Sequence, residues 1–122
     1  MTQATDTLRA AGMNDEQTEC DACGREELRG TVIVVDVDGA EVGRYGTSCA
    51  SRVLGVKITR SDAVNRENLR RRGVCHEIGA ARKALAAGQL DRVAMHVRDL
   101  DRFHVVHRAD EIAAVAELRA SL

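Results

Sequence analysis

The sequence predicts an α+β fold in which a β-hairpin comes first and helices follow. Three observations predict it. The run TVIVVDV at residues 31–37 is rich in β-branched residues, and Asp38–Gly39 after it is a typical two-residue hairpin turn. From residue 61 onward, apolar residues recur at helical spacing. The chain has 122 residues, so we expect a single domain, in which residues 18–56 form the first part and residues 57–122 a mainly helical remainder.

In the first part, we expect a short helix from Thr7 to Ala11, ended by Gly12. The strand Thr31–Val37 is followed by a return strand in AEVGRYG at residues 40–46. The segment TSCASRVLG at residues 47–55 then predicts a helix. Thr47 or Ser48 would cap its start and Gly55 would close its end.

In the remainder, Ser61 is a candidate N-cap for a helix over Asp62–Ala87, with Gly88 just beyond its end. Gly73 and Gly79 weaken this helix, because each costs about 1 kcal/mol relative to alanine. Further helices are expected over residues 90–100 and 110–118, and FHVVH at residues 103–107 reads as a short strand. The residues expected to face the core are Val74, Ile78, Ala81, Leu85, Leu90, Val93, Ala94, Val97, Leu100, Ile112, Val115 and Leu118.

The composition is that of a soluble globular protein with a poor core. The chain is 44% hydrophobic and 30% charged, but it has one Phe, one Tyr and no Trp. A metal or a partner subunit would help such a chain to fold. We see no signal peptide and no apolar run of about 20 residues, so we expect a cytoplasmic protein without membrane contact. In that reducing compartment, cysteines are metal ligands or free thiols rather than disulfides.

Three cysteines stand where metal ligands are typically placed. Cys20 and Cys23 flank the tight turn CDACG, and Cys49 falls in the first turn of the expected helix at residues 47–55. Backbone N–H groups of the turn and the N-terminus of the helix both favour thiolates. Zn²⁺ binds four cysteine or histidine groups tetrahedrally in structural sites. The sequence therefore predicts a structural zinc site that includes these three cysteines.

The order of turn, hairpin and helix resembles a treble-clef zinc finger over residues 20–55. More narrowly, CGREEL, the β-rich run and YGTSCASRVLG resemble a group of small proteins of actinobacteria and their phages. Those proteins share a CxxCGR…L…TV start and a GTxCA end. The resemblance implies zinc and no particular activity.

The fourth zinc ligand departs from that pattern. A treble clef takes it one turn after the third, which in this chain is Arg52. We favour Cys75 as the fourth ligand, with His76 next to it as the alternative, because structural sites are normally closed by four ligands. The other candidates are His96, His104 and His107, which we read as surface or core histidines. An open site with three cysteines remains, and it would suggest reactivity.

Other readings of the cysteines are weighed against zinc. A Cys-x-x-Cys sequence can be a redox pair, but no strand is expected before Cys20, and the chain has no proline to face such a pair. Cys49 could be a buried helix thiol, although its company with Cys20 and Cys23 argues for a ligand. Cys75 alone is as well explained as a core residue.

Charge is polarised along the chain. Residues 1–43 carry three basic and ten acidic residues, whereas residues 44–72 carry eight basic and two acidic ones. Such a basic segment could contact phosphates, or it could be a solvated face or a match to the acidic first third. Only Tyr45 and Phe103 could stack on bases. The candidate residues for nucleic-acid or partner binding are Arg52, Lys57, Arg60, Arg66, Arg70, Arg71 and Arg72.

No catalytic motif is present, so we expect no enzyme and no small-molecule substrate. The chain has neither a phosphate-cradling glycine loop nor Gly-x-Ser-x-Gly nor a zinc-protease helix motif. Three functions remain. The first is a zinc-binding module of phage or mobile-element origin that binds a protein as an adaptor or modulator. The second is nucleic-acid binding, including DNA binding, through Arg52–Arg72. The third is thiol redox chemistry or metal transfer.

Overall fold

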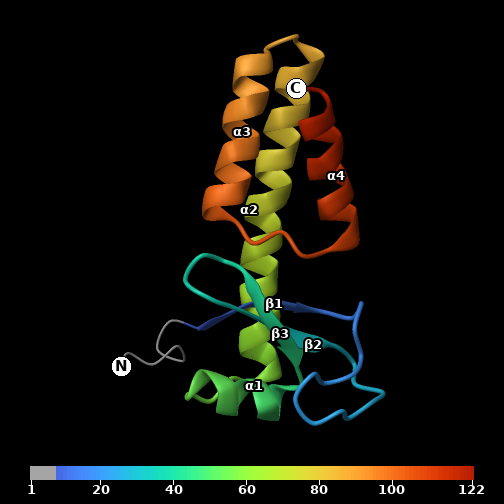
Figure 1. Cartoon of the computed structure of the whole chain (residues 1–122), viewed down its shortest axis with the longest axis vertical. Coiled ribbons are helices and arrows are strands. Elements are labelled where there is room, and N and C mark those ends of the chain that lie inside the picture. Colours follow the sequence, from blue (N-terminus) through green and yellow to red (C-terminus); the bar gives the residue numbers. More distant parts are fainter. Residues whose placement is uncertain (1–7) are drawn as a thin grey trace. The chain divides into compact units, whose positions relative to one another are not determined.

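The computed structural model describes residues 8–122 and confirms the α+β class (Figure 1). A three-stranded antiparallel sheet comes first and helices follow. The described residues form two compact units, one ending at Leu69 and one beginning at Arg70. The expectation of a single domain stays a prediction. The elements are β1 (Arg9–Asn14), β2 (Thr31–Val35), β3 (Glu41–Tyr45), α1 (Thr47–Leu54), α2 (Arg60–Ala86), α3 (Leu90–Phe103) and α4 (Ala109–Ala120).

In the first unit, β2 is the central strand between β1 and β3. All five of its residues are buried, as expected for an uninterrupted β-branched run that is covered on both faces. Val32 pairs with Met13 on one side and with Tyr45 on the other. Ile33 of β2 is fully buried, and the main apolar cluster of the first unit has Met13 and Ile58 as its largest buried members, with a few half-buried residues around it. Its buried members are Ala10, Met13, Val32, Val34, Ala50, Ile58 and Ala63.

The helix expected over residues 7–11 is wrong for residues 8–11, and Thr7 lies outside the described residues. Residues 9–14 form the edge strand β1 instead, with a bulge between Ala10 and Gly12. Pairing with β2 buries Ala10, Ala11 and Met13, and this burial overrides the helical preference of alanine. Gly12 fits because Glu67 lies against it: a Cβ at this position would come within 2.2 Å of the Glu67 carboxylate.

The hairpin and the helix after it are confirmed. The Asp36 carboxylate accepts hydrogen bonds from the N–H groups of Asp38 and Ala40, and Gly39 takes a positive φ of 84°. The predicted N-cap of α1 is wrong: the cap residue is Gly46, with no capping side chain. Gly55 ends α1 in the left-handed conformation, as expected.

Helix α2 begins at Arg60, slightly earlier than expected, and runs to Ala86. Its start is capped by Thr59 rather than by Ser61. The Thr59 hydroxyl accepts a bond from the N–H of Asp62 at 3.1 Å, and the Asp62 carboxylate accepts one from the N–H of Thr59 at 3.0 Å. Gly73 and Gly79 do not interrupt the helix.

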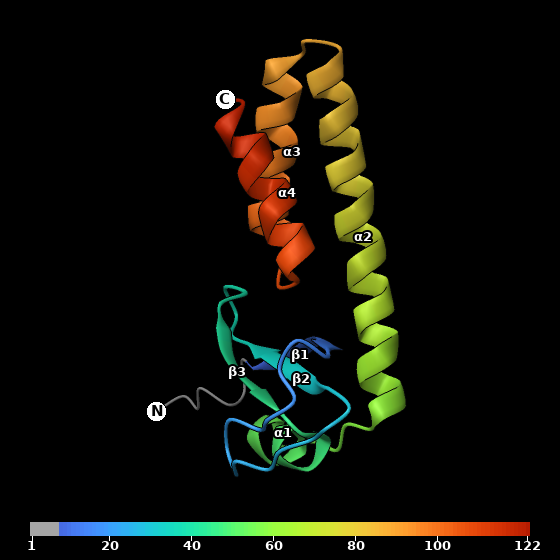
Figure 2. The same cartoon turned by 90° about the vertical axis from the view of Figure 1, so that its right-hand side faces the viewer.

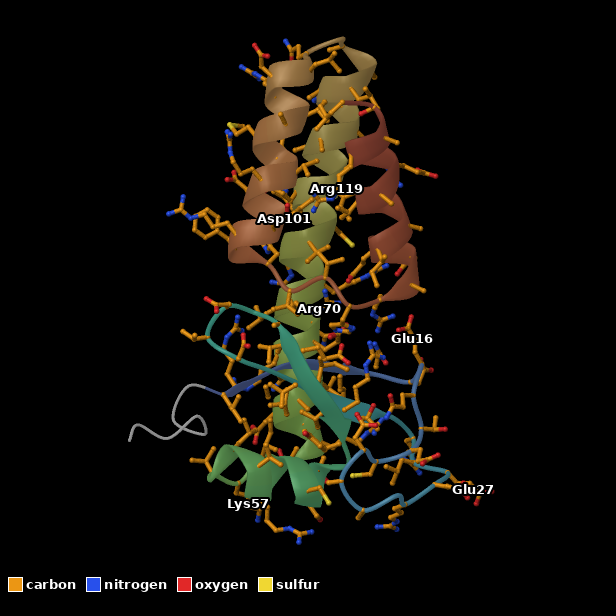
Figure 3. All side chains as sticks on the ribbon, viewed as in Figure 1. Glu16, Glu27, Lys57, Arg70, Asp101 and Arg119 are labelled. Carbon is orange, nitrogen blue, oxygen red and sulfur yellow. The ribbon has the colours of Figure 1, made fainter. Side chains whose placement is uncertain are left out.

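In the second unit, α3 and α4 run alongside the later part of α2 (Figures 1 and 2). Figure 3 shows Asp101 and Arg119 pointing toward one another, and these side chains form an ion pair between α3 and α4. The buried core of this unit is Val74, Ile78, Ala81, Ala84, Val93, Val97, Leu100, Ala114, Val115 and Leu118.

Several residues expected in that core are exposed. Leu85, Leu90 and Ile112 are surface residues, and Ala94 is half-buried. The strand expected at residues 103–107 is also wrong, because residues 104–107 form an irregular link between α3 and α4. On α4 the inward position next to Ile112 is taken by a carboxylate, Glu111.

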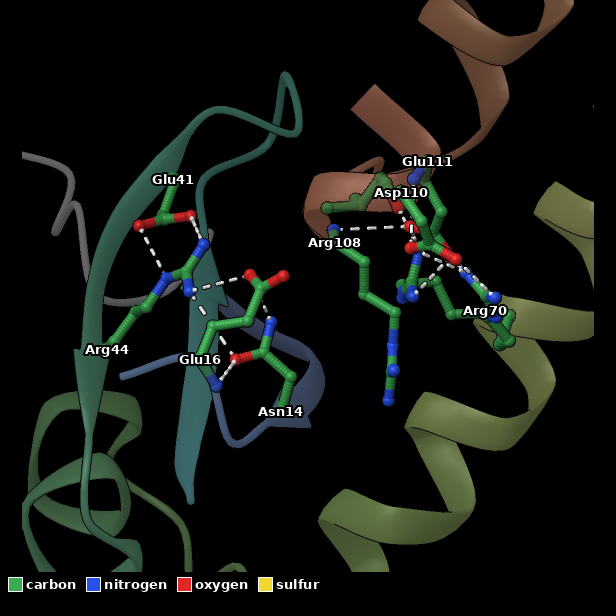
Figure 4. A network of polar contacts seen from close by, with 10 residues as sticks. Asn14, Glu16, Glu41, Arg44, Arg70, Arg108, Asp110 and Glu111 are labelled. Carbon is green, nitrogen blue, oxygen red and sulfur yellow. Dashed lines mark hydrogen bonds and ion pairs between the residues drawn. The ribbon is translucent and has the colours of Figure 1, made fainter. Parts of the chain in front are cut away.

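Glu111 can take the inward position in place of Ile112 because its partner is a buried arginine from α2. Arg70 donates to both carboxylate oxygens of Glu111 at 2.7 and 2.9 Å and to the Val105 carbonyl at 2.7 Å (Figure 4). Arg71 donates to Glu111 at 2.7 Å and pairs with Asp110 at the same distance. The Glu111 carboxylate is only 1% exposed, because its charge is fully paired. A local pattern of apolar residues does not predict such a buried carboxylate.

Among the described residues, no helix combines the length and the apolar character that crossing a bilayer requires.

Candidate metal centre

The turn that holds Cys20 and Cys23 is fixed by its own backbone. The N–H of Gly24 donates to the Cys20 carbonyl at 2.9 Å, and the N–H of Cys20 donates to the Arg25 carbonyl at 2.9 Å. Gly24 has a φ of +73°, a conformation that glycine adopts without a steric cost. This geometry turns the chain back on itself between the two cysteines.

The same turn is paired with the outer edge of β3. The N–H of Asp21 donates to the Arg44 carbonyl at 2.9 Å, and the N–H of Arg44 donates to the Asp21 carboxylate at 2.8 Å. The Gln17 side chain donates to the same carboxylate at 2.7 Å. Because α1 follows β3 directly through Gly46, this pairing carries Cys20 to the start of α1.

The Arg44 side chain adds to this anchoring from within the first unit. Its guanidinium forms ion pairs with Glu41 at 3.1 Å and Glu16 at 3.5 Å and lies 3.4 Å from the Asn14 amide oxygen (Figure 4). Glu16 follows β1, and Arg44 lies on β3, so the pair ties the start of the irregular segment to the sheet. Figure 3 shows Glu27, farther along this segment, pointing away from the sheet.

Cys49 completes a group of three sulfurs. It lies in the first turn of α1, and the sulfurs of Cys20, Cys23 and Cys49 are all within 4.8 Å of one another. A tetrahedral zinc with Zn–S bonds of about 2.3 Å needs sulfurs that are about 3.8 Å apart. Cys20 and Cys49 are buried and Cys23 is exposed, so the group lies at the surface with one open side. The three cysteines can hold a metal ion.

The surroundings of Cys20 favour its thiolate. Burial raises the pKa of this thiol, but hydrogen bonds from backbone groups of Cys23, Gly46 and Ala22 outweigh burial. With a smaller contribution from the Cys49 thiol, they lower the pKa of Cys20 to about 7. The neighbouring Cys20 and Cys23 sulfurs raise the pKa of Cys49 in turn. A metal cation would remove this competition, since it accepts all three sulfurs as thiolates.

The described part of the first unit offers no fourth ligand. Within residues 8–69, no other Cys, His, Asp or Glu joins the three cysteines. The position one turn after Cys49 is occupied by Arg52, which donates to the Cys49 sulfur at 3.4 Å. Arg52 also lines a cavity of about 230 Å³ together with the three cysteines.

Cys75 and His76, the predicted fourth ligands, lie on α2 in the second unit, and both are exposed. Cys75 lines a cavity of about 250 Å³ in that unit with Arg71 and Arg82. Their role as ligand to the group of three cysteines stays a prediction.

The remaining histidines are placed in the second unit. His96 contacts the carboxylate of Glu77, and His104 approaches the other oxygen of that carboxylate at 3.8 Å. His107 is buried. His107 is thus a core residue as expected, whereas His96 and His104 are half-buried beside Glu77 rather than on the surface.

The basic segment is divided by the structure. Arg52, Lys57, Arg60, Arg66 and Arg72 are exposed, and Arg66 donates to the Ala10 carbonyl at 3.4 Å. The side chains of Arg70 and Arg71 are 6% and 35% exposed and bind the carboxylates of α4. The seven residues therefore do not all offer their charge to solvent.

Sequence reasoning missed two contributors to the site. Arg25 lines the cavity beside the sulfurs, and the backbone of Gly46 supports the Cys20 thiolate. Neither has a sequence signal beyond its place next to a cysteine. The contact of Arg52 with Cys49 was open to prediction, because residues three apart lie on the same side of a helix.

Comparison of the chain with protein-family models, curated proteins and solved structures gives no match. The interpretation of the site therefore depends on its own geometry.

Proposed function

We propose that this chain is a small zinc-binding module whose metal is structural and whose role is to bind another protein. One Zn²⁺ on Cys20, Cys23 and Cys49 would hold the first unit in a treble-clef-like arrangement. The convergence of three sulfurs from two separate segments within 4.8 Å carries this proposal. A redox pair needs two thiols, and the third buried thiol at the same place favours a metal instead.

Zinc analysis of the reduced, full-length chain tests the metal. We expect about one zinc per chain. Serine at position 20, 23 or 49 should reduce the zinc content sharply, because each sulfur contributes one of the few bonds. Freshly prepared, reduced protein without zinc or any other transition metal would contradict the proposal.

Two features support a protein as the partner. The arginines at the end of the basic segment, Arg70 and Arg71, bind carboxylates of their own unit, which leaves fewer cations for phosphates. On the hairpin, Val37 in the turn and Val42 on β3 are 72% and 46% exposed, so these two apolar side chains are available for a protein to bury.

A binding experiment separates protein from nucleic acid. We expect the full chain to co-purify with a stoichiometric protein, and Val37→Ser with Val42→Ser to lose it at unchanged zinc content. We expect no salt-dependent mobility shift with duplex DNA at physiological salt. A shift that disappears when Lys57, Arg60 and Arg72 become alanine would favour nucleic-acid binding through the exposed part of the basic segment.

A further inference from the structure

The cavity beside the three sulfurs is the feature that a structural zinc leaves unexplained. It has a volume of about 230 Å³ and lies wholly within the first unit. Cys20, Cys23 and Cys49 line one part of it. The rest of its lining is Arg25, Leu28, Gly46, Thr47, Ser48 and Arg52.

The charge of the lining is unbalanced in a way that points to an anion. Two arginines and no carboxylate line the cavity. Arg52 is fixed toward the metal position, because it lies three residues after Cys49 on α1 and donates to the Cys49 sulfur at 3.4 Å. Its guanidinium is charged at every physiological pH and offers five N–H donors, so it has donors left for a further anionic group.

The coordination chemistry limits what this group is. Three cysteines would supply three of the four ligands of a tetrahedral zinc, and the cavity is lined by the same three cysteines, so a fourth ligand could enter from it. Zinc bound by thiolates accepts a further thiolate or an imidazole. A neighbouring guanidinium attracts the anionic sulfur and gives a neutral imidazole no comparable gain.

We propose that the fourth position of this zinc centre is a thiolate-binding site that Arg52 makes selective for an anionic sulfur over an imidazole. The inference rests on the proposed zinc centre. The incoming thiol gives its proton to solvent and forms one Zn–S bond, and no electrons are transferred. The sulfur has two sources, Cys75 of this chain or a thiol from outside it, and both have the same chemistry.

Cobalt substitution tests the proposal without depending on any activity. Co²⁺ in place of Zn²⁺ gives sulfur-to-metal charge-transfer absorption that grows with each bound thiolate. The full chain and its variants are loaded with Co²⁺, and the absorption per bound cobalt is recorded during titration with 2-mercaptoethanol or imidazole. The variants are Cys75→Ser, and Arg52→Gln and Arg52→Lys in the Cys75→Ser background. Arg29→Ala is the control, because Arg29 is an exposed arginine of the same unit that does not line the cavity.

We expect the cobalt-loaded Cys75→Ser variant to gain absorption when it binds 2-mercaptoethanol. We expect the same variant to bind imidazole more weakly than it binds 2-mercaptoethanol. Arg52→Gln should weaken thiol binding by about tenfold through loss of the nearby charge, with a smaller loss for Arg52→Lys and none for Arg29→Ala. If the unsubstituted chain already absorbs as a four-sulfur site and ignores added thiol, Cys75 is the source. If it behaves like Cys75→Ser, the source is external.

Equal thiol binding by Arg52→Gln and its parent would overturn the role of Arg52, and imidazole binding as tight as thiol binding would overturn the selectivity. In both cases the cobalt would still be held by three sulfurs, and the proposed zinc centre would stand. A chain that binds no cobalt would instead overturn the centre and this inference with it.

Discussion

The two units of this chain are stabilised in different ways. In the first unit, residues 15–30 lie between β1 and β2 without a helix or strand, and Cys20 is their only buried residue. In the second unit, three helical segments bury a continuous set of aliphatic side chains, with Leu100 and Leu118 at its centre. Long segments without secondary structure are uncommon in compact domains unless something other than a core holds them. Three converging cysteines are the candidate for that role.

The two units also differ in the polar groups that they bury. The second unit buries a complete ion pair of its own, Arg70 with Glu111. The first unit buries two thiols whose pKa values move in opposite directions: backbone hydrogen bonds lower the pKa of Cys20, and the Cys20 and Cys23 thiols raise the pKa of Cys49. The second unit therefore pairs its buried charges within its own chain, whereas the first unit gathers thiols that can hold a metal ion.

Metal removal should have the largest effect and should fall on the first unit. A strong chelator under reducing conditions should expose the amides of residues 15–30 to hydrogen exchange, since zinc binding contributes on the order of 10 kcal/mol in structural sites. The fluorescence of Tyr45, the single tyrosine, reports on the same unit. Amides of α3 and α4 should stay protected, and added zinc should restore the loop.

Two outcomes would change that comparison. Loss of the helices together with the loop would show that the chain folds as the single domain that its sequence predicts. Continued protection of residues 15–30 without metal would show that hydrogen bonds such as Asp21–Arg44 are sufficient to hold the segment.

The second unit should be most sensitive at its buried ion pair. Glu111→Gln leaves Arg70 buried without its counter-ion, which should lower the free energy of unfolding by about 3–5 kcal/mol in denaturant titrations. Zinc content should not change. Glu117→Gln is the matched control, because Glu117 forms an exposed, 4.0 Å pair with Arg82 and should cost less than about 1 kcal/mol. Equal effects of the two variants would contradict the role of the buried pair.

In the fraction of the metal-free protein that keeps the turn of Cys20 and Cys23 folded, Cys20 should titrate well below an ordinary cysteine. Its pKa of about 7 lies under the unfolded value of 9.0, so the folded state binds fewer protons between these values. The free energy of unfolding of the metal-free chain should therefore rise with pH from about 7 to 9 and lose this contribution as pH falls through 7. Alkylation rates resolved by peptide mapping measure the titration. A Cys20 profile centred near 9 in metal-free protein whose residues 15–30 are still protected from hydrogen exchange would be the contrary result.

The smallest effect concerns the two glycines inside α2. A Cβ at Gly79 would meet no atom within 4 Å, so Gly79→Ala should stabilise the second unit by about 1 kcal/mol in thermal unfolding. A Cβ at Gly73 would lie 3.0 Å from the His104 ring, so Gly73→Ala should gain less or lose stability. Identical shifts for both variants would show that the His104 contact is not rigid.

The elements that could be predicted from the sequence are those with a local signal. The hairpin signal at Asp38–Gly39 and Gly55 at the end of α1 act within a few residues, and the structure confirms the hairpin and Gly55. The predicted two-residue turn is wrong, because residues 36–40 form a longer loop in which Gly39 has a positive φ. Strand β1 could not be predicted, because Ala10 and Ala11 have no strand preference of their own and become a strand only by pairing with β2. On α4, the apolar pattern favoured Ile112 over Glu111, since the partner that lets Glu111 be buried lies on another helix.

In the candidate site, too, only the features with a local sequence signal could be predicted. The spacing of Cys20 and Cys23 and the position of Cys49 in a first helical turn are local features, and the structure brings the three together. The cavity and its arginines depend on how the turn pairs with β3, which no residue pattern in the turn specifies.

Zinc K-edge X-ray absorption of the reduced, full-length protein tests most directly whether a metal at these cysteines organises the first unit. The account predicts a shell of three or four sulfur atoms at about 2.3 Å from zinc. A spectrum with only nitrogen and oxygen neighbours at about 2.0–2.2 Å, or a protein that retains no zinc, would contradict it.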